Sequence, residues 1–108
     1  MKDIENKADI ELLVNTFYEK VQADTLLAPL FAHVDWPHHL PAMYSFWSSM
    51  MLDERRYQGN PLQKHMPLGL KAAHFERWLA LFHATVDELF EGDKAEEIKM
   101  RAQSIAMV

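Results

Sequence analysis

Apolar side chains recur along this chain at the spacing of one face of an α-helix, and this periodicity constrains the fold more than any other feature. The longest stripe comprises Phe75, Trp78, Leu79, Phe82, Val86 and Phe90. Because positions three and four apart share one side of a helix, this stripe predicts a helix over about residues 71 to 91. Gly92 follows at the position where a helix C-cap is expected.

Three other segments show the same spacing. The first predicts a helix over about residues 7 to 23, the second a helix from about Met43 to Leu52, and the third a helix still in progress at Val108. Their apolar residues are Ile10, Leu13, Val14, Phe17 and Val21; then Met43, Phe46, Trp47, Met50 and Met51; and last Ala95, Ile98, Ala102 and Ile105. The pattern contains no strand-like alternation, so the predicted fold class is all-α.

The connecting segments are less regular. Residues 26 to 31 are short and interrupted by Pro29, which favours a turn or short helix that delivers Phe31 inward. Residues 32 to 41 are the least regular part of the chain. Residues 55 to 70 contain two glycines and two prolines, so we expect a loop there with at most a turn or two of helix near His65.

Composition places the chain among ordinary globular proteins. Its 108 residues suit a single domain, and 49% of them are hydrophobic and 25% charged. The net charge of −5, with scattered lysines and arginines, argues against nucleic acid or a membrane surface as partner. The absence of cysteine excludes disulfides, thiolate catalysis and iron–sulfur ligation. With no signal-like or membrane-spanning stretch, the expected location is the cytoplasm.

Histidine is the obvious candidate for a metal ligand, and the chain has six. A lone helical histidine is more often structural, and His33, His38, His74 and His83 show nothing beyond that expectation. His65 differs because it ends a loop that contains Gly-Asn-Pro, where a short segment can be held against a flat ligand. A neutral imidazole can bind iron through one nitrogen while the other donates to a carbonyl. His65 is therefore the best single ligand candidate.

Several runs together resemble the group III truncated haemoglobins. They are Phe17-Tyr18-Glu19-Lys20-Val21, Pro29-Leu30-Phe31, Phe46-Trp47, the run from Tyr57 through Gly-Asn-Pro-Leu to His65, and His74-Phe75-x-x-Trp78-Leu79-x-Leu81-Phe82. The resemblance covers nearly the whole chain. It implies one truncated-globin domain over residues 1 to 108, folded as a two-over-two helical sandwich around haem b, with His65 as the proximal ligand of a five-coordinate iron.

The resemblance also assigns roles around the haem. Tyr18 and Trp78 would be distal hydrogen-bond donors to a diatomic ligand, although periodicity alone would make Trp78 a core residue and leave the Tyr18 hydroxyl in water. His39, eight residues before Trp47, would be a distal gate, and Pro41 close behind it places it either at a helix start or in a loop that swings outward. The remaining implied pocket residues are Phe31, Met43, Phe46 and Trp47 as apolar lining, and Arg56, Tyr57 and Lys64 near the propionates.

The implied function is binding of O2 and related diatomic ligands such as NO and CO. A polar distal pocket slows O2 release, which favours NO dioxygenase-like or peroxidase-like chemistry, with an unknown reductase, over simple oxygen transport. The alternative that stays open is a haem-free helical module that binds a protein partner or a small apolar ligand in the same cavity.

Overall fold

The described part of the structure, a computed structural model, comprises residues 1–52 and 71–106. These residues form helices and short connections, and no strand occurs among them. In chain order the elements are α1 (Lys7–Ala23), the 3-10 helix η1 (Ala28–Phe31), α2 (Trp36–Met51), α4 (Ala72–Leu89) and α5 (Asp93–Ala106). The predicted all-α fold class is confirmed.

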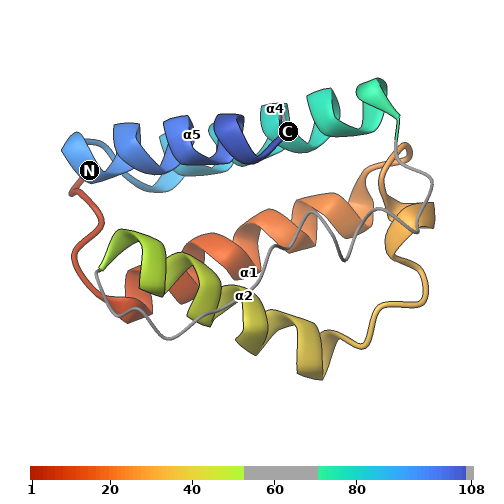
Figure 1. Ribbon diagram of the computed structural model, residues 1–108, viewed down its shortest axis with the longest axis horizontal. Helices are drawn as coiled ribbons and strands as arrows, with labels where there is room; N and C mark the ends of the chain where they lie inside the picture. Colours follow the sequence, from red (N-terminus) through yellow and green to blue (C-terminus); the bar gives the residue numbers. More distant parts are fainter. Residues whose placement is uncertain (53–70, 107–108) are drawn as a thin grey trace.

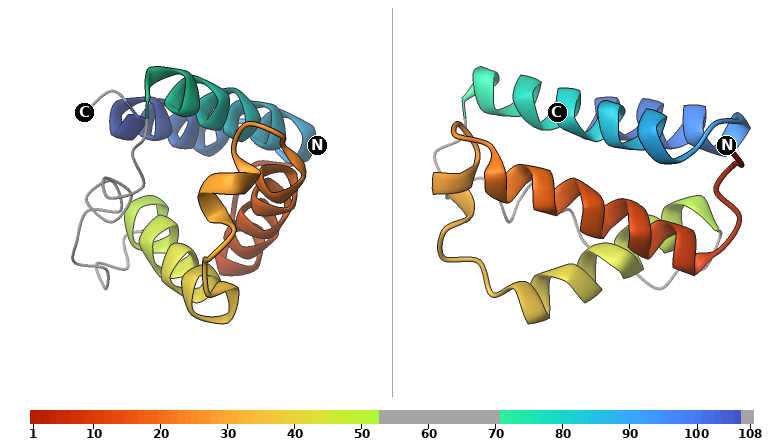
Figure 2. Two further views of the ribbon diagram at one scale, coloured as in Figure 1. Left: turned by 90° about the vertical axis from the view of Figure 1, so that its right-hand side faces the viewer. Right: turned by 180° about the vertical axis from the view of Figure 1, so that it is seen from behind.

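The helices form two stacked layers of two. α4 and α5 lie side by side in one layer, and α1 and α2 form the other, as the front and rotated views both show (Figures 1 and 2). Between the layers, α1 packs against α4. The core therefore sits where the apolar stripes of α1, α2 and α4 face one another. Within the described ranges, no helix is both long and apolar enough to cross a bilayer.

Helix α1 has the bounds that its apolar stripe predicts. Asn6 caps its start, because the side-chain Oδ1 accepts a hydrogen bond from the Asp9 backbone N–H at 3.0 Å. The stripe on α1 is fully buried, from Ile10 to Val21. The short helix η1 that follows buries Phe31, as expected from the sequence.

Helix α2 begins at Trp36, earlier than the predicted start near Met43. Two prolines hid this first part from a prediction based on periodicity. Pro37 lies in the first turn, where its missing N–H would have no helical partner, and Pro41 lies inside the helix. The first helical bond runs from the His39 N–H to the Asp35 carbonyl at 2.8 Å, so the helix is already established before Pro41.

Gly92 is not the C-cap of α4, as the sequence suggested. That helix ends at Leu89, with Phe90 at the C-cap, and Gly92 instead precedes α5 with a φ of 137°. A Cβ atom on Gly92 would lie 2.6 Å from the Asp3 Cγ atom. The Asp3 carboxylate occupies this space and accepts hydrogen bonds from the Lys94 and Ala95 N–H groups at 2.9 Å each. Asp3 thus caps α5 from the opposite end of the chain.

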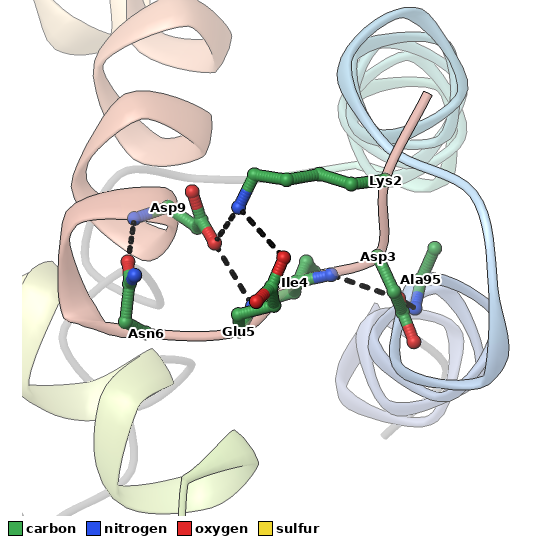
Figure 3. A network of polar contacts seen from close by, with 7 residues as sticks. All are labelled: Lys2, Asp3, Ile4, Glu5, Asn6, Asp9 and Ala95. Carbon is green, nitrogen blue, oxygen red and sulfur yellow. Dashed lines mark hydrogen bonds and ion pairs between the residues drawn. The ribbon is translucent and has the colours of Figure 1, made fainter.

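The residues before α1 form an N-terminal strap, residues 2–6, between the two layers (Figure 3). Its Lys2 carbonyl accepts a hydrogen bond from the Glu91 N–H at 3.0 Å, beside α4. On the other side, the Lys2 ammonium meets the Asp9 carboxylate of α1 at 2.5 Å. The strap therefore ties the start of α1 to the junction of α4 and α5.

Candidate functional site

The candidate site begins at Tyr18, on the inner face of α1. Its side chain is 3% exposed and its ring meets three others at centroid distances of 6.1 Å to Phe31, 5.3 Å to Trp36 and 5.2 Å to His39. These partners come from η1 and from the first turns of α2. The early start of α2 is what brings Trp36 and His39 against α1.

The Tyr18 hydroxyl is a neutral hydrogen-bond donor. Burial raises the pKa of the phenol far above its usual value, so the proton stays on the oxygen throughout the physiological range. No hydrogen bond of this hydroxyl is found among residues 1–52 and 71–106. It is available to donate to a bound molecule.

Trp78 lies on α4 and reaches Tyr18 through one intervening ring. Phe17 contacts Tyr18 at 4.9 Å and the edge of Trp78 at 5.4 Å, and the indole stacks on Phe82 at 5.5 Å. The indole Nε1 is buried and has no partner in the described part of the chain. Leaving a buried donor unsatisfied costs roughly 1–3 kcal/mol, so this N–H marks a position where an acceptor would be stabilised.

The apolar residues expected to line the cavity are buried on α2. Met43, Phe46 and Trp47 each have little exposure, and Phe46 meets Trp47 at 5.0 Å. Trp47 in turn stacks on Phe82 of α4 at 5.0 Å. These side chains join α2 to α4 and form an aromatic wall that continues to Trp78.

His39 does not lie in a loop that swings outward, which was one of the two expectations that Pro41 raised. It sits in the first turns of α2, with its ring edge-on to Tyr18 at 5.2 Å and to Trp36 at 5.5 Å. Trp36 itself was missed by the sequence analysis. It precedes His39 by three residues, a spacing that puts both on one helix face, and a helix start at Trp36 would have revealed it.

The expected proximal ligand and its neighbours, His65, Arg56, Tyr57 and Lys64, lie outside the described residues. Two of the remaining histidines have structural partners. The His74 Nδ1 accepts a hydrogen bond from the Lys71 N–H at 2.9 Å, and the His83 Nε2 lies 3.2 Å from the Lys99 carbonyl. Within residues 1–52 and 71–106 no cluster of three potential metal ligands occurs.

Comparison with known proteins gives consistent matches. Residues 2–107 match the profile of the bacterial-like globin family. The group 3 truncated haemoglobin ctb of Campylobacter jejuni is 35% identical over 108 residues, covering 94% of this chain and 85% of that protein. The group 1 truncated haemoglobin GlbN of a Nostoc species is 31% identical over 68 residues, covering 62% of this chain and 58% of that protein.

The fold agrees with the sequence matches. The crystal structure of the group III truncated haemoglobin from Campylobacter jejuni matches with a TM-score of 0.87 and 36% identity, over 99% of this chain and 91% of that one. Truncated globins carry haem and bind small gas ligands such as O2. The family profile, the sequence relatives and the two-over-two fold together show that this chain belongs to the group III truncated haemoglobins, within the bacterial-like globin family.

Proposed function

We propose that the protein binds haem b through His65 as the proximal ligand of a five-coordinate iron. In this proposal Tyr18 and Trp78 are donors to a diatomic ligand, and His39 gates the distal side. Phe31, Met43, Phe46 and Trp47 line the haem, while Arg56, Tyr57 and Lys64 hold its propionates. The physiological reaction is oxidative detoxification of NO or peroxide, with electrons from a separate reductase, and CO is a competing ligand.

The observation that carries this proposal is the unsatisfied indole N–H of Trp78. It is buried among aromatic rings and lacks an acceptor within the described part of the chain. Apolar cavities built from packed side chains do not normally leave such a donor without a partner. A ligand with partial negative charge, held on the distal side, would supply the missing acceptor and be stabilised by it.

The Tyr18 hydroxyl supports the same interpretation. Its raised pKa keeps it protonated, so it can only donate to an anionic ligand atom or accept from a third group. Hydrogen bonds to charged atoms contribute roughly 1.5–3 kcal/mol, more than neutral ones. Two such donors would favour ligands that gain negative charge on binding, and they would disfavour rapid release of O2.

When bound, haem supplies reversible coordination of O2, NO and CO and the electron exchange that peroxide reduction requires. The chain's own residues determine how a bound ligand is held. Tyr18 and Trp78 would orient the ligand and stabilise charge on its outer atom, while the aromatic wall that contains Phe46 and Trp47 excludes water. Slow release of O2 suits a reaction with a second molecule better than delivery.

Haem titration is the test that separates this proposal from a haem-free helical module. Purified protein should bind haemin stoichiometrically and show a Soret band that moves on reduction and on addition of CO. A protein with no Soret band, and none after haemin is added, would leave the haem-free alternative standing. Stopped-flow mixing of the oxygenated protein with NO, and of the ferric protein with hydrogen peroxide, would then identify the faster reaction.

A further inference from the structure

A continuous series of aromatic rings runs from the candidate pocket to the surface. It begins with Trp78 and Phe17, in contact at 5.4 Å, followed by Tyr18 at 4.9 Å from Phe17. Tyr18 then meets Trp36 at 5.3 Å. Trp36 and Trp78, at the two ends of the series, are partly buried, whereas Tyr18 and Phe17 between them are buried. The series therefore leads from the distal donors to a side chain in contact with solvent.

Trp36 lies at a solvent-accessible end of this series of rings. The first turn of α2 lies at the edge of the molecule farthest from the layer of α4 and α5 (Figures 1 and 2). The indole packs on three rings, those of Tyr18, Phe31 at 6.1 Å and His39 at 5.5 Å. These contacts fix its position while part of its surface stays open, which is the arrangement that electron exchange with a molecule in solution requires.

The chemistry of the residues matters as much as their position. Tryptophan and tyrosine lose one electron at potentials that a peroxide-derived oxidant can reach, whereas phenylalanine does not. Electron transfer between side chains falls off exponentially with distance, so ring contacts such as that of Tyr18 with Trp36 dominate over longer jumps. The last oxidisable step toward solvent is therefore from Tyr18 to Trp36.

We propose that Trp36 is the surface electron relay of this pocket, passing electrons through Tyr18 to peroxide reduced on the distal side. The inference rests on the proposed function. Each hydrogen peroxide takes up two electrons and two protons and leaves as two waters. Trp36 gives up one electron at a time and releases its indole proton to solvent. A phenol or similar one-electron donor then restores it, losing one electron and one proton per step.

The surroundings favour Trp36 over Tyr18 as the side chain that holds the radical after oxidation. A phenol that loses an electron usually also loses its proton, and no hydrogen bond of the buried Tyr18 hydroxyl is found in the described ranges, so oxidised Tyr18 is unstable and takes an electron from Trp36. Trp36 can release its proton to water.

Rapid-freeze electron paramagnetic resonance on the haem-loaded protein tests this inference. After mixing with hydrogen peroxide, the protein should show a tryptophan radical, which ring-deuterated tryptophan identifies by its narrowed spectrum. Trp36→Phe should lose that signal, and Trp36→Tyr should replace it with a tyrosine radical. Tyr44→Phe is the matched control, because Tyr44 lies on the same helix but donates its hydroxyl to Asn15 and has no described ring contact. This variant should keep the tryptophan signal.

The outcomes separate the relay from the function on which it rests. If peroxide changes the haem absorption but Trp36→Phe keeps the full tryptophan radical, the relay is wrong and the proposed function stands. The same holds if no tryptophan radical forms at all. If peroxide leaves the haem absorption unchanged, the peroxide reaction itself fails and the relay with it. Mass spectrometry of protein exposed to peroxide without a reductant gives an independent check, since oxygen addition should concentrate on Trp36.

Discussion

At the scale of single residues, the two proposed distal donors, Tyr18 and Trp78, come from different helices and are held by different neighbours. Tyr18 is fixed by the rings of Phe31, Trp36 and His39, and Trp78 by stacking on Phe82. Neither donor depends on a protein partner in the described residues. We therefore expect each to contribute to ligand retention independently, rather than through a shared network of hydrogen bonds.

Replacing either donor by phenylalanine should speed O2 release. Tyr18→Phe and Trp78→Phe each keep an aromatic ring but remove one hydrogen bond to a charged ligand atom, worth roughly a tenfold or greater change in dissociation rate. Stopped-flow displacement of O2 by CO measures this rate. Tyr44→Phe, which removes a phenol outside the site, should leave it unchanged. If neither donor variant changes the rate, both side chains belong to the core alone.

His65→Ala should remove the proposed proximal ligand. A five-coordinate ferrous haem bound by histidine has an iron–histidine stretch in its resonance Raman spectrum, and this band should disappear in the variant. Imidazole added in solution should restore it, because it can fill the space left by the side chain. His38→Ala, at an exposed position of α2, is the control. Survival of the band in His65→Ala would assign the ligand to another histidine.

Sequence alone could suggest the proposed donors only through the resemblance to a family. Periodicity places Trp78 on an apolar stripe and gives no reason for its indole N–H to lack a partner, since that depends on how four helices meet. Trp36 could not be identified because the prolines after it concealed the helix that holds it. Its contacts with Tyr18 depend on the early start of α2.

At the scale of helices, boundaries were predictable where the apolar stripe was uninterrupted. The bounds of α1 follow from its stripe and from the capping Asn6. The predicted start of α2 and the predicted C-cap at Gly92 were wrong for a common physical reason: proline and glycine are each compatible with more than one position in a helix. The position of Gly92 is decided by its contact with Asp3. Asp3 is far from Gly92 in the sequence, so no local sequence pattern could predict this contact.

Gly92→Ala should destabilise the junction of α4 and α5. The added Cβ would collide with the Asp3 carboxylate, and a φ of 137° is strained for any residue with a side chain. We expect a loss of about 1–3 kcal/mol in the free energy of unfolding. Urea denaturation measures it. Ala80→Gly, at an exposed position in α4, serves as a control for helix propensity alone and should cost about 1 kcal/mol.

Asp3→Asn should lower stability in a pH-dependent way. Burial opposes ionisation of Asp3, but hydrogen bonds from the Lys94, Ile4 and Ala95 N–H groups outweigh it and lower the pKa of the carboxyl. A lowered folded-state pKa means that the unfolded chain binds the proton first, so the stabilisation is present above the usual value near 4 and is lost as the pH falls through the folded value.

The stability difference between wild type and Asp3→Asn should therefore be largest above about pH 5 and shrink below about pH 4. At neutral pH we expect about 0.3–1 kcal/mol, the contribution of a negative charge at a helix N-terminus. Urea unfolding at several pH values measures it. Asp93→Asn, an exposed acid in the same turn, provides the comparison. A difference that does not vary with pH would show that Asp3 acts through packing and not through its charge.

At the scale of the whole molecule, the contacts of the N-terminal strap and the candidate site lie near opposite ends of α1. The strap, with Asp3 and Lys2, holds the end where α1 begins and α4 meets α5 (Figure 3). Tyr18, Trp36 and His39 lie near the other end of α1, around the first turns of α2. Interactions at sites that share no partners generally add, so stability and ligand binding should respond to mutation separately.

Haem should stabilise the molecule by mass action, and this gain should depend on the site but not on the strap. A ligand present at about a thousand times its dissociation constant adds about 4 kcal/mol to the free energy of unfolding. Urea denaturation of wild type, Asp3→Asn and His65→Ala, each with and without haemin, measures the gain. Asp3→Asn should lower stability by the same amount in both states, leaving the gain intact. His65→Ala should lose most of the gain. Equal gains in all three proteins would mean that haemin binds without His65, and a gain reduced in Asp3→Asn would mean that the strap and the site are energetically coupled.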